Sequence, residues 1–307
     1  MNVLRSVLLW GSENEFLARR LPRYGFVKRA VQRFMPGEDL EDALSESSAL
    51  SMHDKGTLLT LLGENVNEES KSIEVVQSYL DALAAVGERS LDVEISVKLT
   101  QLGLDLDGGV AESNLRALVE SSGKLDRMVW VDMESSAYVD RTLALYRAVR
   151  ADHANVGICL QSYLRRTPED LETMLRLGAA VRLVKGAYAE PPEIAFPKKH
   201  DVDEAFFALA CRLIDAQPPV RGAFGTHDGA LVRRIQAVGE ARGVDRGRLE
   251  FQMLYGIGVR DQDRLAADGY RVQVLISYGS AWFPWYMRRL AERPANVTFV
   301  LRKMFSS

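Results

Sequence analysis

Near its C-terminus the chain reads Tyr270-Arg271-Val272-Gln273-Val274-Leu275-Ile276-Ser277-Tyr278-Gly279-Ser280. Apolar, partly β-branched residues alternate with polar ones in the first seven positions, which predicts a β-strand. Gly279 and Ser280 then predict a turn into a helix. Tyr278 therefore leaves the end of a strand just before a helix that carries Trp285, Arg288 and Arg289.

The adjacent pair Arg288 and Arg289 has two interpretations. Neighbouring positions on a helix diverge by about 100°, so the two side chains converge on one small anion only if both flank the same face. Alternatively, both are solvated near a helix C-terminus, where positive charge suits the macrodipole. The pair alone does not decide between a solvated surface and an anion clamp.

Strand-like runs recur upstream of this segment, with helical patterns between them: residues 57–62, 91–99, 128–133, 156–160, 181–184, 222–225 and 249–253. The sequence Thr167-Pro168-Glu169-Asp170 predicts a helix start, with an N-cap and a proline in the first turn. Four glycines follow helical patterns where C-caps are expected: Gly87, Gly178, Gly243 and Gly269.

Strands that alternate with helices predict an α/β fold with parallel strands, and eight such units over roughly 220 residues are typical of a (β/α)8 TIM barrel. A doubly wound sheet is the alternative. Against it, the chain has no G-x-G-x-x-G motif, because Gly256-Ile257-Gly258 lacks the third glycine and follows the seventh strand. Residues 1–50 are predicted to form a polar helical arm, and residues 51–307 the barrel domain.

Composition limits the classes of function. The chain has 307 residues, a net charge of -3 and no long run of Lys or Arg, which argues against a nucleic-acid partner. Its two cysteines, Cys159 and Cys211, lack the spacing of a metal site. Two free thiols are typical of a protein in a reducing cytoplasm. The apolar cluster around Trp10 is too short for a membrane span or a signal peptide, although it leaves peripheral membrane contact open.

Polar residues lie at the C-terminal end of every predicted strand. In chain order they are Glu64, Lys98, Asp132, Glu134, Gln161, Arg182, Lys185, Thr226, His227, Asp228, Gln252, Tyr255 and Tyr278. In a barrel these ends form one rim, where barrel enzymes carry their catalytic residues. The many cations suit anionic ligands, such as a carboxylate held by arginine and a phosphate-bearing cofactor. The pattern predicts a barrel enzyme that acts on a small carboxylic acid.

Each rim residue also has an ordinary explanation. Lys98 or Lys185 could be a structural ion-pair partner, and His227 a histidine that is hydrogen-bonded at a strand end. Asp132 and Glu134 could bind a metal, but no second histidine lies nearby to complete a usual ligand set. Gly186 could relieve crowding or let the backbone approach a phosphate.

Several strings at these strand ends are similar to those of one known family. They are Leu62-Gly63-Glu64, Ser96-Val97-Lys98-Leu99, Val131-Asp132-Met133-Glu134, Leu160-Gln161-Ser162-Tyr163-Leu164, Val181-Arg182-Leu183-Val184-Lys185-Gly186-Ala187-Tyr188, Thr226-His227-Asp228, Glu250-Phe251-Gln252-Met253-Leu254-Tyr255-Gly256, and Tyr278-Gly279 through Arg288-Arg289-Leu290-Ala291-Glu292. Together they resemble the flavin-dependent proline dehydrogenases, from about residue 50 to the end. The resemblance implies a distorted (β/α)8 barrel whose last helix lies over the barrel mouth.

The resemblance also implies roles for individual residues. Lys98, Arg288 and Arg289 match a substrate carboxylate clamp, and Tyr278 matches a side chain that packs on the substrate ring. Asp132 matches a catalytic-site carboxylate, Arg182 an arginine near the flavin N5, and Glu64 an acid that pairs with an arginine to gate the site. The matches to flavin contacts are Met133, Gln161, Arg182, Lys185, Gly186, Ala187, Thr226 and His227.

The implied activity is oxidation of L-proline to Δ1-pyrroline-5-carboxylate, the first step of proline catabolism to glutamate. Non-covalently bound FAD would take a hydride at N5 and pass the electrons to a membrane quinone. This implies a cytoplasmic enzyme in peripheral contact with the inner face of the membrane. The arm could serve homo-oligomerisation, membrane contact or solubility, and these alternatives stay open.

Two other functions remain as alternatives. A Schiff-base lyase would use Lys98 or Lys185 as its nucleophile, since barrels host that chemistry as well. A non-catalytic carboxylate-binding barrel would use the same cations without turnover.

Overall fold

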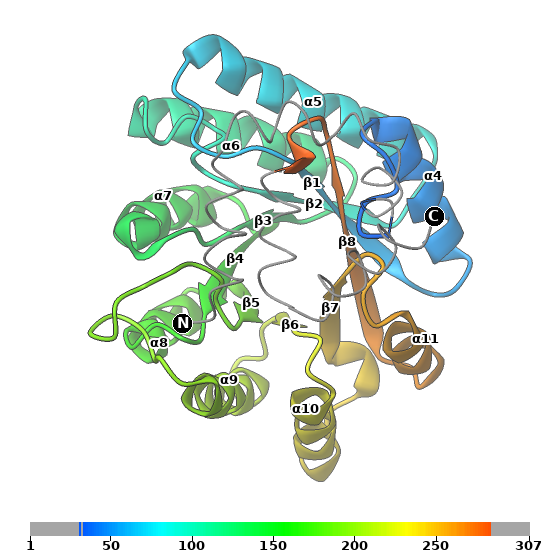
Figure 1. Ribbon diagram of the computed structural model, residues 1–307, viewed down its shortest axis with the longest axis vertical. Helices are drawn as coiled ribbons and strands as arrows, with labels where there is room; N and C mark the ends of the chain where they lie inside the picture. The colour runs from blue at the N-terminus through cyan, green and yellow to red at the C-terminus, as the bar shows by residue number, and fades with distance from the viewer. Residues whose placement is uncertain (1–30, 32, 284–307) are drawn as a thin grey trace, which may run out of the picture.

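Eight parallel strands form the centre of the computed structural model, which describes residues 31 and 33–283. They close into a barrel in which neighbours in the chain pair with each other and β8 pairs with β1 (Figure 1). Their bounds are β1 Gly56–Leu61, β2 Val93–Val97, β3 Val129–Val131, β4 Val156–Gln161, β5 Ala180–Val184, β6 Gly222–Gly225, β7 Glu250–Leu254 and β8 Arg271–Tyr278. The predicted (β/α)8 barrel is confirmed, and the doubly wound alternative is wrong.

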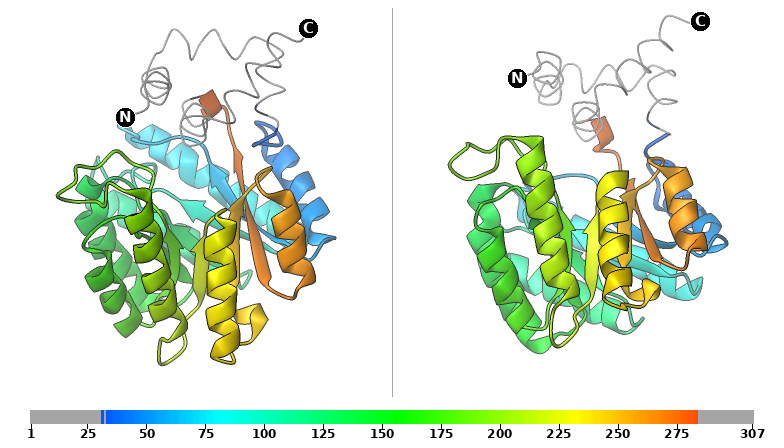
Figure 2. Two further views of the ribbon diagram at one scale, coloured as in Figure 1. Left: turned by 60° about the horizontal axis from the view of Figure 1, so that its bottom comes forward. Right: turned by 90° about the horizontal axis from the view of Figure 1, so that it is seen from below.

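Helices surround the strands on the outside of the barrel (Figure 2). One α-helix follows each of β1 to β7: α5 Glu69–Glu88, α6 Gly108–Gly123, α7 Val139–Asp152, α8 Thr167–Arg176, α9 Lys199–Ile214, α10 Gly229–Ala241 and α11 Val259–Ala267. Short 3-10 helices, η2 Ser136–Tyr138 and η3 Arg246–Arg248, precede α7 and β7. This alternation places the C-terminal ends of all eight strands on one side of the molecule.

The helix ends lie where the capping residues predicted them, except at Gly87 and Thr167. Gly178, Gly243 and Gly269 have φ angles of +59°, +65° and +84° just after α8, α10 and α11, as expected of C-cap glycines. The prediction for Gly87 is wrong, because Gly87 lies inside α5 and Ser90 takes the positive φ. Thr167 is the first residue of α8, with Arg166 as N-cap.

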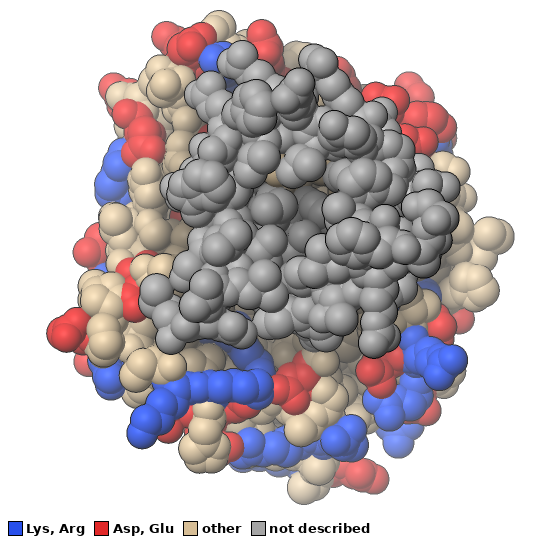
Figure 3. Space-filling view, viewed as in Figure 1, with Lys and Arg blue, Asp and Glu red and all other residues tan. Residues whose placement is uncertain are grey.

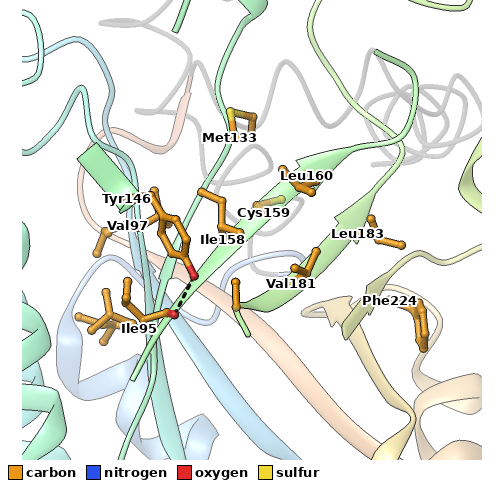
Figure 4. Close-up of a cluster of buried hydrophobic side chains, with 14 of the residues drawn as sticks. Ile95, Val97, Met133, Tyr146, Ile158, Cys159, Leu160, Val181, Leu183 and Phe224 are labelled. Atoms are coloured by element: carbon orange, nitrogen blue, oxygen red, sulfur yellow. Dashed lines mark hydrogen bonds between the residues drawn. The ribbon is translucent and has the colours of Figure 1, made fainter. Parts of the chain in front are cut away.

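The main hydrophobic core lies between the strands and the helices. Figure 4 shows part of it, including Ile95, Val97, Ile158 and Val181, all fully buried. Tyr146 of α7 donates a hydrogen bond from its hydroxyl to the carbonyl of Val156, at 3.2 Å. This core holds the helices against the outer surface of the barrel.

Inside the barrel the apolar layer is small. Leu58, Trp130, Ala180 and Ala223 form a separate buried cluster. Because side chains alternate across a strand, positions two residues from these also face the interior. Arg182 is such a position, and residues in register with the cluster on neighbouring strands share its face. The buried polar or charged residues of the strands include Glu94, Ser96, Arg182, Glu250, Gln252 and Gln273. Buried polar groups at the centre of a barrel require partners or a function.

The described part of the predicted arm packs on the barrel. Helix α4, Leu40–Ser51, crosses the predicted boundary at residue 50 and buries Ala43, Leu44 and Leu50. In the segment before α4, Glu38 accepts hydrogen bonds from Gly279 N and Trp282 Nε1, at 2.8 and 3.0 Å. Residues 1–30 and the predicted last helix over the barrel mouth lie outside the described residues.

Candidate active site

Arg182 of β5 lies at the centre of the barrel, just below the rim. Its side chain is 5% exposed and forms an ion pair with Asp132 at the end of β3. It also donates to Ser96 Oγ at 2.9 Å and to Gln252 Oε1 at 3.1 Å. Burial acts to lower the pKa of Arg182, but Asp132, Cys159 and Glu250 together raise it, so the pKa lies above its usual value. Arg182 is a permanent buried cation held on three sides.

Asp132 links this buried cation to a second one at the rim. Its Oδ1 accepts a hydrogen bond from Ser96 Oγ at 3.0 Å, and its Oδ2 lies 3.8 Å from Lys98 Nζ. The side chain of Lys98 is 15% exposed and that of Asp132 23%, so the cluster opens towards the rim. Two cations with one carboxylate between them leave positive charge for an anionic ligand. The structure thus brings together the predicted residues Lys98, Asp132 and Arg182.

Two members of this cluster have no predicted role from sequence. Ser96 lies two residues before Lys98 on the same face of β2, and Trp130 lies two residues before Asp132 on β3. The Arg182 guanidinium lies 5.4 Å from the centroid of the Trp130 ring, within reach of a cation–π contact. Side chains two residues apart on a strand share a face, so counting two residues back from Lys98 and from Asp132 finds both positions.

Gln161 and Met133 form the next part of the rim. Gln161 is buried at the end of β4 and donates from Nε2 to the carbonyl of Met133, at 3.1 Å. The carbonyl of Gln161 accepts from Thr167 Oγ1 at 2.5 Å, which fixes the start of α8. Gln161 Oε1 is buried and has no hydrogen-bond partner among the described residues. This amide oxygen is therefore available to accept a hydrogen bond from a bound ligand.

Lys185 follows β5 and lies in a cluster of four charges. Its Nζ donates to Asp203 Oδ1 at 2.5 Å and to Asp228 Oδ2 at 2.9 Å, and Lys199 pairs with the same two carboxylates. Burial acts to raise the pKa of Asp228, but hydrogen bonds from Lys185 and Lys199 hold it below its usual range. The structural ion-pair reading of Lys185 therefore has direct support.

Gly186 and Ala187 continue this loop. Gly186 has φ +110°, and a Cβ atom there would lie 2.2 Å from Cδ1 of Tyr163. Only glycine fits, because the backbone conformation and the Tyr163 ring both exclude a side chain. This observation supports the crowding interpretation of Gly186. Ala187 is exposed.

The end of β6 carries Thr226, His227 and Asp228. Thr226 is buried, and its Oγ1 accepts from the backbone N–H of Asp228 at 3.1 Å. His227 Nε2 accepts from the backbone N–H of Leu254 at 2.9 Å, so this nitrogen is unprotonated and joins the ends of β6 and β7. Asp228 caps α10 by accepting from Ala230 N. The ordinary reading of His227 as a hydrogen-bonded strand-end residue has a contact to support it.

Glu134 and Glu64 lie on the opposite side of the rim. Glu134 is buried and accepts from Thr100 Oγ1 at 2.6 Å and from Thr100 N at 3.2 Å, and burial raises its pKa. Within the part of the chain that the structure describes, no three His, Cys, Asp or Glu residues are placed to bind a metal. Glu64 is half-buried. Its predicted gating partner, Arg288, lies outside the described residues.

Tyr278 is the last residue of β8. Its side chain is buried, and its hydroxyl has no hydrogen-bond partner in the described part of the chain. Burial raises the pKa of this phenol above its usual value, so it is neutral at physiological pH. Arg288 and Arg289, predicted to complete the carboxylate clamp, lie beyond the described residues, and their roles stay predictions.

The surface around the rim carries many charges of both signs. In Figure 3, Lys and Arg side chains gather over the lower part of this face, where α9, α10 and α11 lie in Figure 1. Exposed cations of these helices and of the residue before α9 include Lys198, Lys199, Arg233, Arg260 and Arg264. This part of the rim suits a ligand with phosphate groups.

Comparisons with known proteins agree with this arrangement. A family model described as proline dehydrogenase matches residues 43–302. Proline dehydrogenase 1 of Bacillus subtilis (strain 168) is 35% identical over 301 residues, which cover 98% of each chain. Proline dehydrogenase of Deinococcus radiodurans is 33% identical over 279 residues, which cover 89% of each chain.

Solved structures share the fold. Proline utilization A of Bdellovibrio bacteriovorus, in a form inactivated by N-propargylglycine, superposes with a TM-score of 0.83 at 22% identity, covering 99% of this chain and 38% of that one. A Bradyrhizobium japonicum proline utilization A variant gives a TM-score of 0.77 at 23% identity, covering 89% of this chain and 32% of that one. This chain thus spans about a third of those longer proteins. From the family model and the full-length relatives, the chain belongs to the proline dehydrogenase family.

Proposed function

We propose that this protein oxidises L-proline to Δ1-pyrroline-5-carboxylate with bound FAD as the electron acceptor and a quinone as the final oxidant. The observation that carries the proposal is the cluster of Arg182, Asp132 and Lys98 at the barrel rim, in a chain of this family. Its buried and half-buried cations suit a small carboxylate next to a redox cofactor.

The residues of the rim fit a flavin. Gln161 Oε1 is buried without a hydrogen-bond donor among the described residues, and the isoalloxazine ring has an imide N–H that would supply one. The residues proposed to hold the cofactor are Met133, Gln161, Arg182, Lys185, Gly186, Ala187, Thr226 and His227. When bound, the flavin supplies a hydride acceptor.

The side chains of this site position the substrate rather than exchange protons with it. Lys98, with Arg288 and Arg289, is proposed to hold the carboxylate, and Tyr278 to pack on the pyrrolidine ring. Arg182 supplies a fixed positive charge below the rim, and Asp132 orients both Arg182 and Lys98. Hydride loss from the carbon next to nitrogen requires the nitrogen lone pair, so the neutral amine of proline reacts. Glu64 is proposed to gate entry.

The Schiff-base alternative has less support. Lys185 donates to two carboxylates, and Lys98 lies 3.8 Å from the carboxylate of Asp132. A Schiff-base nucleophile needs an amine with a free lone pair rather than an ion-paired ammonium. The alternative of a non-catalytic carboxylate-binding barrel does not explain why Arg182 and Asp132 form a buried ion pair at the rim.

The proposal includes a cellular setting. In the described part of the chain, no helix is both long and apolar enough to cross a bilayer. We propose a cytoplasmic protein that contacts the membrane surface transiently to reach its quinone.

The activity is tested by product identification. The purified protein is incubated without oxygen with L-proline and a water-soluble quinone, and the cyclic imine product is trapped with o-aminobenzaldehyde. We expect one imine for each quinone reduced, and neither product with D-proline. Quinone reduction without imine, or borohydride trapping of a keto acid on Lys98 or Lys185, would contradict the proposal.

A further inference from the structure

A continuous series of polar contacts runs from Arg182 down through the interior of the barrel. Arg182 Nη1 donates to Gln252 Oε1 at 3.1 Å, and Gln252 Nε2 donates to Glu250 Oε1 at 2.7 Å. Gln252 and Glu250 are two residues apart on β7, so both face the interior. Both are almost fully buried. The amide of Gln252 thus joins the active-site arginine to a carboxylate below it.

That carboxylate belongs to an ion-pair network at the N-terminal end of the barrel. Glu250 accepts from Arg221 Nε at 2.8 Å, and Glu94 accepts from Arg221 Nη1 at 2.6 Å. Arg271 approaches both carboxylates, at 3.3 Å from Glu250 and 3.4 Å from Glu94. Two acids thus meet two arginines, and their charges balance. We call these four residues the lower network.

Trp130 separates the lower network from Arg182. Its indole Nε1 donates to Glu94 Oε2 at 2.7 Å. The guanidinium groups of Arg221 and Arg182 lie 5.1 and 5.4 Å from the ring centroid. One indole ring thus contacts a cation of the network and the cation of the active site, and it is fully buried. Among the described residues, Gln252 also joins Arg182 to the lower network, through one hydrogen bond to each.

The direction of the Gln252 amide is fixed by its partners. Its oxygen faces a guanidinium, which only donates, and its nitrogen faces a carboxylate, which only accepts. A neutral side chain at this position keeps Glu250 from pairing directly with Arg182. Arg182 therefore forms its direct ion pair with Asp132, and the charge of Glu250 acts on it only at longer range. The group of Lys98, Arg182 and Asp132 carries one more positive than negative charge.

We propose that Gln252 is a positioning residue that holds the Nη1 edge of Arg182 and keeps the Glu250 carboxylate away from it. Gln252 thereby sets both the orientation of Arg182 and the strength of the positive charge that Arg182 presents at the rim. The inference rests on the proposed function, in which that charge acts on a bound flavin.

Three variants of the holoenzyme test this inference. Gln252→Glu is nearly isosteric and adds a carboxylate beside Arg182, whereas Gln252→Leu removes both hydrogen bonds. Gln273→Leu is the matched control, because Gln273 pairs with Gln252 in the β7–β8 register, is fully buried, and has no hydrogen-bond partner for its amide among the described residues.

The main readout is the dissociation constant of sulfite, an anion that binds to flavins and bleaches their visible absorbance. Positive charge near the flavin favours this anionic complex. We expect the sulfite dissociation constant to rise about tenfold or more in Gln252→Glu, which adds a negative charge, and about threefold to tenfold in Gln252→Leu, which only removes hydrogen bonds. Turnover of L-proline should fall in kcat more than it changes KM, while Gln273→Leu keeps wild-type values.

Wild-type sulfite affinity in folded, flavin-loaded Gln252→Glu overturns the inference, as does an equal effect of Gln273→Leu and Gln252→Leu. If Gln252→Leu fails to fold, the isosteric Gln252→Glu still decides. Measurements on the wild-type protein distinguish failure of the proposed function from failure of the proposed role of Gln252. If it binds no flavin, or its flavin is not bleached by L-proline, the proposed function fails and takes this inference with it; a normal wild type with unaffected Gln252 variants contradicts the inference alone.

Discussion

At the scale of single residues, the shared carboxylate of Asp132 explains why two cations can lie so close at the rim. Arg182 is 5% exposed and Lys98 is 15% exposed, and Asp132 contacts both. A buried arginine keeps its charge, whereas its position depends on the acceptors around it. The chemistry of the site therefore depends on geometry that a change of one side chain can disturb.

The guanidinium of Arg182 cannot be replaced by an ammonium group. Arg182→Lys keeps the charge but loses the fork that reaches Asp132, Ser96 and Gln252 together. Losing two charge-assisted hydrogen bonds, at about 1.5–3 kcal/mol each, predicts a fall of at least about 100-fold in kcat/KM for L-proline. Arg234→Lys on exposed α10, where Arg234 pairs with Glu204, is the control and should keep wild-type kinetics. Equal effects of both changes would contradict the role of Arg182.

The hydroxyl of Tyr278 has a testable role because it is buried without a partner among the described residues. Tyr278→Phe removes an unpaired buried polar atom, so thermal stability should stay the same or rise. If Tyr278 packs on the substrate ring, the preference in kcat/KM for L-proline over 4-hydroxyproline should fall several-fold. Unchanged selectivity would refute the contact, and a drop in melting temperature would show that the hydroxyl has a structural partner.

How much of the site could be predicted differs from residue to residue. Lys98, Asp132 and Arg182 were predictable, because parallel strands in a barrel bring their C-terminal ends together. The positions of Ser96 and Trp130 follow from counting two residues back from Lys98 and Asp132, but their roles do not, because each looks like an ordinary core residue of its strand. Their contacts with Arg182 depend on the closure of β8 onto β1 and on the barrel width, which no local pattern encodes.

At the scale of elements, strand centres followed from composition better than strand ends did. The apolar run 91–99 extends beyond β2, Val93–Val97, because Leu99 continues into a turn in which Leu102 N donates to Leu99 O. Conversely, β8 reaches Tyr278, beyond the run 270–276, because Ser277 and Tyr278 pair with Thr60 and Leu61 of β1. Ladder partners set the ends of a strand, and these lie far away in sequence.

The cluster of Lys185, Lys199, Asp203 and Asp228 joins β5, α9 and α10. Because the folded-state pKa of Asp228 is depressed, its contribution to the free energy of unfolding is present above the unfolded pKa of about 3.9 and is lost as the pH falls through the folded pKa.

Asp228→Asn should therefore destabilise the protein at neutral pH, and the difference from wild type should shrink below about pH 4. Asparagine still caps α10, so the change isolates the charge. The check is urea unfolding from pH 3 to pH 7 at matched flavin content. A difference that stays constant over this range would show that the ion pairs contribute nothing.

Helix α4 belongs structurally to the barrel that it precedes in sequence. Leu44 is 1% exposed, so Leu44→Ala should lower the free energy of unfolding by about 2–5 kcal/mol, the cost of a buried leucine. Met52, next to the helix end, is 78% exposed, and Met52→Ala should change it by less than about 0.5 kcal/mol. Similar small effects in urea unfolding would mean that α4 is a dispensable arm.

At the scale of the whole molecule, the barrel interior differs from the apolar packing expected of the fold. Charged residues fill it from Arg221 and Arg271 at one end to Arg182 and Asp132 at the other. Replacing buried ion pairs by apolar residues often costs no stability, so stability alone does not account for these pairs. In the proposed function, the requirement that these pairs meet is a fixed positive charge beneath the substrate and cofactor.

The central claim is that this positively charged rim brings L-proline to a bound flavin. The most direct test is a visible absorption spectrum of the purified protein, recorded without oxygen before and after L-proline is added. The account predicts flavin bands at the start and their bleaching by L-proline. A fully folded protein without flavin bands, or with bands that L-proline leaves unchanged, would contradict it.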